Sequence, residues 1–180
     1  MDLENYNNIK NQVIEHGYEH DIKWQENVTE CTNQYEFFFE TCWVILNSGM
    51  KEQIARKIWE RIKKAWEDGV DISEVFKHNG KVKAIKYVEE NQSRLFEEYV
   101  LAENKIDYLK TIPFIGNITC YHLAKNLGHD CVKPDRHLVR VAKTYNETPD
   151  SLCEKISKQS GDRKCVVDIV LWRACNLGIL

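Results

Sequence analysis

The sequence has few residues that interrupt helices, with three prolines and eight glycines among 180 residues. It also has no internal repeat and no low-complexity segment. Hydrophobic residues make up 43% of the chain and charged residues 29%, an ordinary globular balance that argues against long disordered tails. A chain of this length suits one well-buried domain or two small lobes that share a core. We therefore expect one ordered functional unit.

A long apolar run is also missing. The strongest run, over residues 166–172, is interrupted by Asp168 and followed by Arg173, so it predicts a buried core helix rather than a membrane span. The first residues lack the basic start and the apolar stretch of a signal peptide. We expect no membrane association and an intracellular location, in the cytoplasm of a prokaryote, at the nucleoid, or in a nucleus.

The seven cysteines, at positions 31, 42, 120, 131, 153, 165 and 175, include no CxxC motif. Zinc and iron–sulfur sites need thiolates at short, regular separations, which this spacing does not provide. The alternative is that these cysteines are small buried hydrophobic residues in a reducing compartment. We interpret them as structural free thiols.

The chain has no overall excess of positive charge, since its net charge is −3. Positive charge is concentrated in one segment, because residues 104–143 hold seven basic and three acidic side chains, a net +4. A local basic face of this kind can attract a phosphate backbone even on an acidic protein. The alternative interpretation is an ordinary solvated surface.

Helical periodicity dominates the remaining pattern and predicts an all-α fold. We expect helices over residues 3–16, 33–47, 51–67, 80–102, 104–111, 117–127, 136–145, 149–159 and 163–176.

The stretch from Asp107 to Gly128 predicts a hairpin of two short helices. Pro113 is expected to close the first helix and Gly116 to permit a tight turn into the second. The turn would leave backbone N–H groups pointing outward at the positive end of a helix dipole, an arrangement that suits a phosphate oxygen. A glycine also lets that oxygen approach the backbone closely.

Asp135 stands directly before an amphipathic helix. The simplest interpretation is an N-cap, because an Asp side chain accepts hydrogen bonds from the first free N–H groups of a helix. A catalytic role does not compete with capping, since a carboxylate fixed at a helix start is held ionised and aimed.

These two motifs together resemble the signature of a known family. The turn Ile112-Pro113-Phe114-Ile115-Gly116, followed nineteen residues after Gly116 by Asp135, closely resembles the helix-hairpin-helix plus Gly/Pro…Asp (HhH-GPD) signature of the endonuclease III superfamily of DNA glycosylases. Residues 38–50 look like that family's core helix and DNA-probing loop, and Lys83-Ala84 is similar to its Lys-Ala turn. The resemblance covers roughly residues 35–175.

The resemblance implies a two-lobed, all-α glycosylase fold with a cleft between the lobes. Residues 35–125 would form a central lobe with the hairpin at 104–128, and residues 1–34 and 126–180 a second lobe carrying Asp135. It implies a monomeric base-excision repair enzyme that hydrolyses the N-glycosidic bond of a damaged or mispaired base in double-stranded DNA. Alkylated purines are the first expectation, because a charged leaving base needs little acid assistance; uracil or thymine in mismatches and oxidised guanine remain open.

The resemblance also assigns roles to individual residues. Asp135 would stabilise positive charge developing on the sugar and help a water molecule attack C1′. Residues expected to contact DNA are Pro113, Gly116, Asn117, Ile118, Thr119, Lys83, Lys133, Arg136 and His137. The wedge or base pocket would draw on Asn47, Met50, Trp43 and Tyr121, with Phe38, Phe39 and Trp172 as further aromatic candidates. The family implies that backbone carbonyls of Lys110, Ile112 and Ile115 can hold a structural Na⁺ or K⁺.

Two features of the family are missing from this sequence. The lysine nucleophile of the strand-cleaving members aligns with Ile118, which cannot attack a sugar, so a monofunctional enzyme is favoured. Only Cys165 and Cys175 lie near the C-terminus, so the four-cysteine iron–sulfur cluster is absent and no cofactor is expected to be required. Two alternatives stay open: a bifunctional glycosylase/lyase acting on oxidised bases with a relocated lysine, Lys133 or Lys110, and a non-catalytic DNA-binding module.

Overall fold

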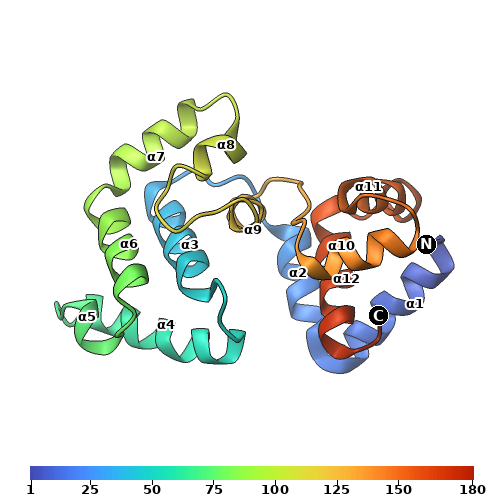
Figure 1. Cartoon of the computed structure of the whole chain (residues 1–180), viewed down its shortest axis with the longest axis horizontal. Coiled ribbons are helices and arrows are strands. Elements are labelled where there is room, and N and C mark those ends of the chain that lie inside the picture. Colours follow the sequence, from blue (N-terminus) through green and yellow to red (C-terminus); the bar gives the residue numbers. More distant parts are fainter. The chain divides into compact units, whose positions relative to one another are not determined.

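The computed structural model describes residues 1–180 and is entirely helical, with no strand (Figure 1). The expectation of an all-α fold is confirmed. The helices are α1 (Leu3–Val13), α2 (Glu19–Asn27), α3 (Gln34–Asn47), α4 (Glu52–Glu67), α5 (Ile72–Val75), α6 (Asn79–Glu90), α7 (Gln92–Leu101), α8 (Lys105–Leu109), α9 (Thr119–Asn126), α10 (Arg136–Thr144), α11 (Pro149–Ser160) and α12 (Lys164–Leu177), with a π-helical turn over Ile14–Tyr18 between α1 and α2.

The chain divides into two compact units. Unit 1 contains Met1–Glu30 together with Ala124–Leu180, and unit 2 contains Cys31–Leu123. The sequence predicted borders near residues 35 and 125. The second border of the structure runs within α9, so the last turn of that helix belongs to unit 1.

The structure differs from the expected helices in three places. The chain continues past residue 16 into α2 through a turn in which Gly17 adopts a left-handed φ of 87°. The short helix α5 was not expected. The helix predicted over 80–102 is two helices, because Asn91 departs from helical ψ and ends α6 with its N–H donated to the Tyr87 carbonyl.

Side-chain caps explain where most of these helices begin. An Asp, Asn or Thr side chain accepts a backbone N–H of the first turn, which satisfies a donor that the helix itself leaves unpaired. The capping residues of this kind are Asp2, Asn33, Asp71, Asn104, Asp135 and Thr148.

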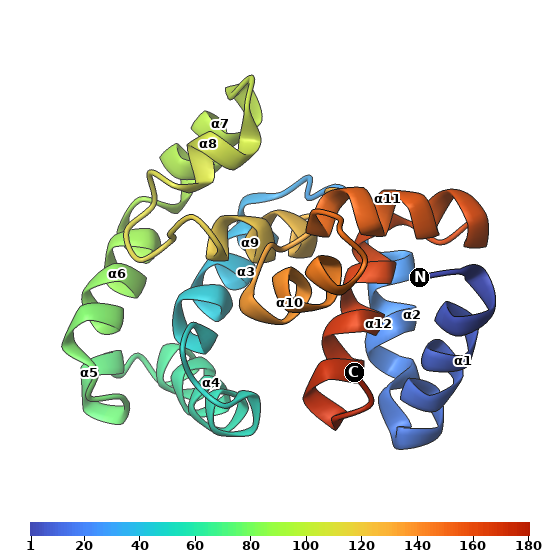
Figure 2. The same cartoon turned by 45° about the vertical axis from the view of Figure 1, so that its right-hand side comes forward.

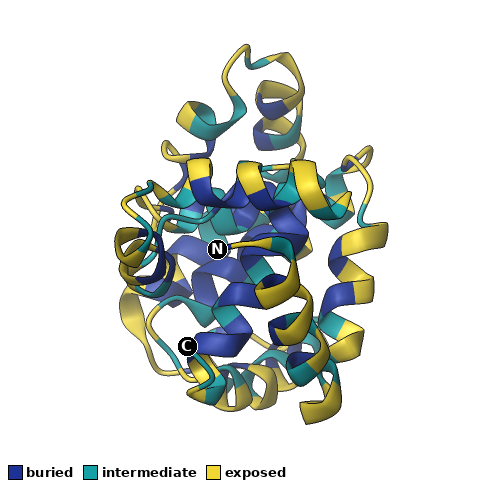
Figure 3. Cartoon of the chain, turned by 90° about the vertical axis from the view of Figure 1, so that its right-hand side faces the viewer, coloured by how far each residue is buried: buried dark blue, intermediate teal, exposed yellow.

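The core of unit 1 is built around α12, the helix predicted from the apolar run near the C-terminus. Helices α1, α2, α10 and α11 pack against it (Figures 1 and 2). Figure 3 shows buried residues gathered toward the interior and exposed residues on the outer faces of the surrounding helices. The fully buried side chains of α12 include Val166, Val167, Val170 and Leu171.

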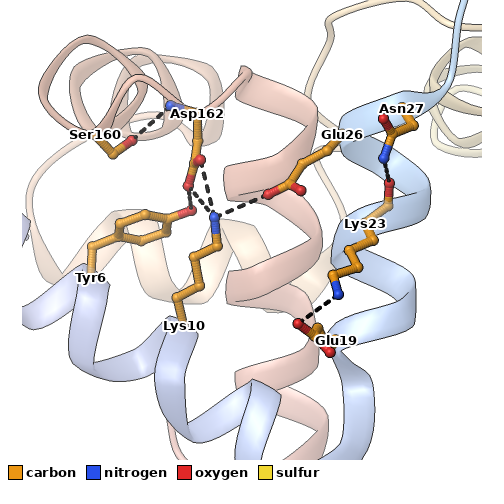
Figure 4. Close-up of polar contacts among 8 residues, drawn as sticks. All are labelled: Tyr6, Lys10, Glu19, Lys23, Glu26, Asn27, Ser160 and Asp162. Atoms are coloured by element: carbon orange, nitrogen blue, oxygen red, sulfur yellow. Dashed lines mark hydrogen bonds and ion pairs between the residues drawn. The ribbon is translucent and has the colours of Figure 1, made fainter.

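A polar cluster ties the N-terminal helix of unit 1 to the loop before α12. The Tyr6 hydroxyl donates a 2.6 Å hydrogen bond to Asp162, and Lys10 Nζ lies 2.9 Å from Asp162 and 3.2 Å from Glu26 (Figure 4). Burial, followed by the hydrogen bond to Asp162, raises the pKa of Tyr6 far above its usual range, so the hydroxyl remains a donor. This cluster joins α1, α2 and the loop at residue 162.

Unit 2 is organised around α3, which packs against α4, α6 and α7. Phe37 is fully buried, and its ring lies 5.0 Å from that of Tyr99 on α7. None of the helices of the chain has the length and apolar character that crossing a membrane requires.

Candidate active site

The hairpin predicted from the sequence consists of α8, a turn and α9, but its details differ from expectation. Helix α8 ends at Leu109, ahead of Pro113, and Lys110 caps its C-terminus. The residue with left-handed backbone in the turn is Phe114, with φ of 71°, rather than Gly116. A non-glycine residue in this region is strained, because its Cβ crowds the neighbouring carbonyl.

Gly116 lies at the exposed start of α9 and takes part in a local cap. Its N–H donates a 2.7 Å hydrogen bond to the Thr119 hydroxyl, and its carbonyl accepts the Cys120 N–H at 3.0 Å. The Gly116 N–H is therefore engaged within the chain, in contrast to the expectation that it faces outward unpaired. Asn117 and Ile118 are exposed and lie ahead of the first residue of α9, where N–H groups have no helical acceptor.

The Gly116 backbone leaves room for a side chain. A Cβ at this position would meet only the Thr119 hydroxyl, at 3.9 Å, which is an ordinary contact. Nothing within the chain therefore requires a glycine here, neither a left-handed φ nor a close neighbour. A glycine is required only if a group from outside approaches the backbone.

The turn of the hairpin lies beside the start of α6. The Phe114 ring is in edge-to-face contact with His78, with ring centroids 5.9 Å apart. A Cβ on Gly80 would lie 3.0 Å from the same Phe114 ring. Lys83, interpreted from the sequence as part of a Lys-Ala turn, lies within α6 and is exposed, so the predicted turn is wrong.

The carbonyls expected to hold a monovalent cation lie in the segment between α8 and α9. The Ile112 carbonyl already accepts the Ile115 N–H at 3.0 Å, and a carbonyl oxygen keeps a second lone pair for another ligand. The Lys110 amine lies 2.9 Å from Asp107, an exposed pair within the hairpin. Carbonyl oxygens are suitable ligands for a hard cation, so the residues present fit Na⁺ or K⁺ in their chemistry.

Asp135 caps α10, as its position in the sequence predicted. Its Oδ1 accepts the N–H of His137 at 2.9 Å and that of Leu138 at 3.2 Å. Its Oδ2 lies 3.2 Å from Lys133 Nζ. The two oxygens therefore have different surroundings, one fixed by the helix and the other beside a cation. The side chain is 14% exposed, so the carboxylate can still be reached from solvent.

Lys133 and Trp172 complete the surroundings of Asp135 in unit 1. Lys133 Nζ lies 5.3 Å from the centroid of the Trp172 ring, and the Arg173 guanidinium lies 4.8 Å from it. Arg173 is itself paired with Asp21 on α2, at 2.5 Å. Among the aromatic candidates, Trp172 is thus the one linked to Asp135 within its own unit. Arg136 is exposed and His137 half-buried on the first turn of α10.

The segment that carries Asp135 has no helical hydrogen bonds. It is held in place by residues of α12 and by Arg163, the residue that precedes α12. Asp130 Oδ1 accepts the Cys165 N–H at 2.9 Å, and Asp168 Oδ2 accepts the Lys133 N–H at 2.5 Å. Arg163 donates to the carbonyls of Val28 and Gly128, at 2.9 and 2.8 Å. The loop is therefore anchored at Gly128, Asp130 and Lys133, all of which precede Asp135.

The loop expected to act as a wedge follows α3 in unit 2. Gly49 has a left-handed φ of 66° and is exposed, and the Met50 N–H donates to the Asn47 carbonyl at 3.1 Å. Asn47 and Met50 are half-buried. From inside, Lys81 Nζ donates to the carbonyls of Leu46 and Ser48, both at 2.6 Å, so a buried lysine holds the end of α3.

The remaining pocket candidates, Trp43 and Tyr121, are both half-buried in the same unit. The Trp43 ring lies 6.1 Å from that of Trp59 on α4, and the Arg56 guanidinium lies 5.6 Å from its centroid. Trp43 therefore belongs to an aromatic cluster of α3 and α4, which is consistent with a packing role for this ring.

The predicted residues thus fall into two groups. Unit 1 brings together Asp135, Lys133, Arg136 and His137; unit 2 holds the hairpin residues Lys110 to Thr119, Lys83 on α6 and the loop at 47–50. Sequence reasoning missed Asp168 and Lys81, both buried. The signal for Asp168 was its position as the only charged residue between Val166 and Trp172.

The cysteines do not form a cluster. All seven are free, and no group of three or more His, Cys, Asp or Glu side chains is arranged to hold a metal ion. Burial raises the pKa of the Cys31 and Cys165 thiols to about 11 and that of Cys131 to about 12, so these thiols are poor nucleophiles near neutral pH.

No family model, no curated protein and no solved structure matches the chain.

Proposed function

We propose that this chain is a monomeric DNA N-glycosylase of the helix-hairpin-helix kind, which hydrolyses the bond between a damaged or mispaired base and its deoxyribose in duplex DNA. The observation that carries the proposal is the state of Asp135, which caps α10 with one oxygen and presents the other beside Lys133. The order of hairpin and capping aspartate along the chain supports it. Such an enzyme works where the DNA is, in the nucleoid of a prokaryotic cytoplasm or in a nucleus.

The proposed chemistry requires only the fixed carboxylate and water. As the C1′–N bond breaks, its electron pair leaves with the base and positive charge develops on the sugar. The Oδ2 oxygen of Asp135 stabilises that charge, because it is held in place before the reaction and does not have to reorganise. Water then adds to C1′, its proton passes to Asp135 and on to solvent, and an abasic site remains. No cofactor takes part, and a monovalent cation at the hairpin would be structural.

The hairpin would bind a phosphate through N–H groups at the start of α9, with Asn117 and Ile118 as the donors that the local cap leaves available. Lys133, Arg136, His137 and Lys83 are the further side chains proposed to contact the backbone of DNA. Double-stranded DNA is the partner. The flipped base would rest on an aromatic wall, for which Trp172 is supported by its link to Asp135 through Lys133.

Gly116→Ala tests the hairpin. We expect the variant to keep the melting temperature of the wild type, because the added methyl group meets only the Thr119 hydroxyl at 3.9 Å. The methyl group should keep a phosphate from approaching the backbone closely. Affinity for a duplex with an abasic site should therefore fall about tenfold, which corresponds to the loss of one charge-assisted hydrogen bond to phosphate. Fluorescence anisotropy with labelled duplex measures the dissociation constant. Val100→Ala, at an exposed residue of α7, is the control, and equal affinities of both variants would contradict the proposal.

The substrate is identified with a panel of duplexes that each carry one lesion. An alkylated purine is the first candidate; uracil, a thymine mismatch and oxidised guanine complete the set. We expect release of one of these bases, measured as strand breakage after alkali. Binding to the lesion duplexes without release of any base would favour the alternative of a non-catalytic DNA-binding module.

The reaction is expected to stop at the abasic site, because Ile118 occupies the position of the lyase lysine. The strand should stay intact until alkali is added, and borohydride should trap no covalent complex, since only an imine between an amine and C1′ can be reduced. Denaturing gels of both reactions make the measurement. A borohydride-trapped complex would show that the enzyme is bifunctional.

Lys133 is the second candidate for that amine, because its Nζ lies 3.2 Å from Asp135. In that case the neutral amine attacks C1′, the base leaves with the electron pair of the broken bond, and Asp135 accepts a proton from the attacking amine. If a complex is trapped, Lys133→Gln should abolish it. Lys110→Gln tests the other relocated lysine, whose amine is paired with Asp107 in the hairpin, and should leave the trapped complex unchanged.

A further inference from the structure

A buried carboxylate is linked to the proposed catalytic residue, Asp135, through a single intervening residue, Lys133. Asp168, in the middle of α12, is 1% exposed, and each of its oxygens has its own partner. Oδ1 lies 2.9 Å from Lys125 Nζ, in the last turn of α9, and Lys125 is also buried. Oδ2 accepts the backbone N–H of Lys133 at 2.5 Å. The carboxylate therefore joins an ion pair to the backbone of the loop before Asp135.

An ion pair in this position is not an efficient way to fasten two helices. Both charges lose their hydration on burial, and apolar residues of similar size often replace such a pair without loss of stability. The Lys133 N–H has a different requirement. It lies outside any helix, so it needs a specific acceptor, and the Asp168 carboxylate supplies one across 35 positions of sequence.

Lys133 connects Asp168 to Asp135, because it contacts both residues. Its N–H is held by Asp168, its carbonyl accepts the Asp135 N–H at 2.8 Å, and its Nζ lies 3.2 Å from Asp135 Oδ2. One residue thus contacts both carboxylates, and a shift of its backbone moves the cation beside Oδ2. Pro134, between the two residues, further restricts the backbone because its ring fixes φ.

We propose that Asp168 is a positioning residue that orients Lys133, and through it Asp135, for the reaction at C1′. Lys125 pairs with one oxygen of the buried carboxylate, and the other oxygen accepts the Lys133 N–H. The inference rests on the proposed function, in which Asp135 is the catalytic residue. It predicts that the acceptor at position 168, rather than the charge, is what the reaction needs.

Two double variants separate the acceptor from the ion pair. Lys125→Met with Asp168→Asn removes both charges but keeps a side-chain oxygen for the Lys133 N–H. Lys125→Met with Asp168→Leu removes both charges and the oxygen as well. We expect the Asn variant to excise the lesion base at close to the wild-type single-turnover rate, and the Leu variant to lose about 10²-fold, the effect of a small misplacement of a reacting group.

Two further measurements distinguish positioning from general damage to the fold. Affinity for abasic-site duplex should differ between the two double variants by no more than the one proposed contact of Lys133 with the DNA backbone, so that most of the loss appears in the rate of the chemical step. Lys133 amide hydrogen exchange should be slow in the wild type and the Asn variant and fast in the Leu variant. The Trp172 indole resonance, assigned with Trp172→Phe, should shift in the Leu variant only, because Lys133 Nζ lies over this ring.

Equal excision rates of two folded double variants would overturn the proposal. If the Leu variant does not fold, fast exchange of the Lys133 amide in the wild type, at the rate of an exposed loop, overturns it as well. Failure of the proposed function has a different signature: no base is released by the wild type from any duplex, while the exchange and indole results still report whether Asp168 holds Lys133.

Discussion

Replacement of Asp135 by Asn should reduce the rate of base excision by about 10²-fold or more, while affinity for the lesion duplex remains close to that of the wild type. The substitution removes a charge and almost no volume. Asn is as good an N-cap as Asp, so α10 keeps its first-turn hydrogen bonds from His137 and Leu138. The ion pair with Lys133 is lost, and the two side chains are only 17% and 14% exposed, so a small decrease in stability is expected. Single-turnover kinetics and anisotropy measure the two quantities.

Asp130→Asn is the matched control for this experiment. Asp130 lies in the same loop and also caps a helix, since its Oδ1 accepts the Cys165 N–H at 2.9 Å. Both variants change one capping carboxylate to an amide, and both should melt within a few degrees of the wild type. Only the Asp135 variant should lose excision. An active Asp135→Asn enzyme, or equal losses in the two variants, would show that the catalytic assignment is wrong.

Features governed by neighbouring residues could be predicted from the sequence. Asp135 was expected to cap the helix that follows it, and the structure confirms this, because a short acidic side chain before an amphipathic segment meets the first free N–H groups. The buried helix at the C-terminus follows equally from its apolar residues. The interpretation of the hairpin as a phosphate-binding element stays a prediction.

Features that depend on distant residues could not be predicted. Helix α2 shows little apolar periodicity, since only Ile22 and Gln25 are buried in it, and its stability comes from packing on α12. Gly116 was expected to permit the tight turn of the hairpin, but the residue with left-handed backbone is Phe114, whose ring contacts His78 at the start of α6. The bond from Lys133 to Asp168 has no local signal at all.

Among the substitutions of glycine by alanine near Asp135, Gly128→Ala is expected to be the most destabilising. Gly128 has a φ of 93°, and a Cβ there would collide with backbone atoms of Thr29 and lie 2.6 Å from the Glu30 nitrogen. Backbone atoms cannot swing aside as a side chain does. Any shift would also disturb Arg163, which bridges the carbonyls of Val28 and Gly128.

The left-handed backbone alone costs an alanine about 1 kcal/mol, and overpacking of this kind adds about 1–3 kcal/mol. We therefore expect the free energy of unfolding to fall by about 3 kcal/mol and the melting temperature by about 10 °C for a chain of this size. Calorimetry or urea unfolding measures the change.

Gly161→Ala separates the two contributions. Gly161 ends α11 with a similar φ of 79°, but nothing lies within 4 Å of the position where its Cβ would be. This variant incurs the backbone strain without the collision and should lose only about 1 kcal/mol. The difference between the two glycines then measures how tightly the start of the Asp135 loop is packed against residues 29 and 30. Equal losses in the two variants would mean that this loop yields to the added methyl group, so that the attachments at Arg163, Asp130 and Asp168 do not fix it in place.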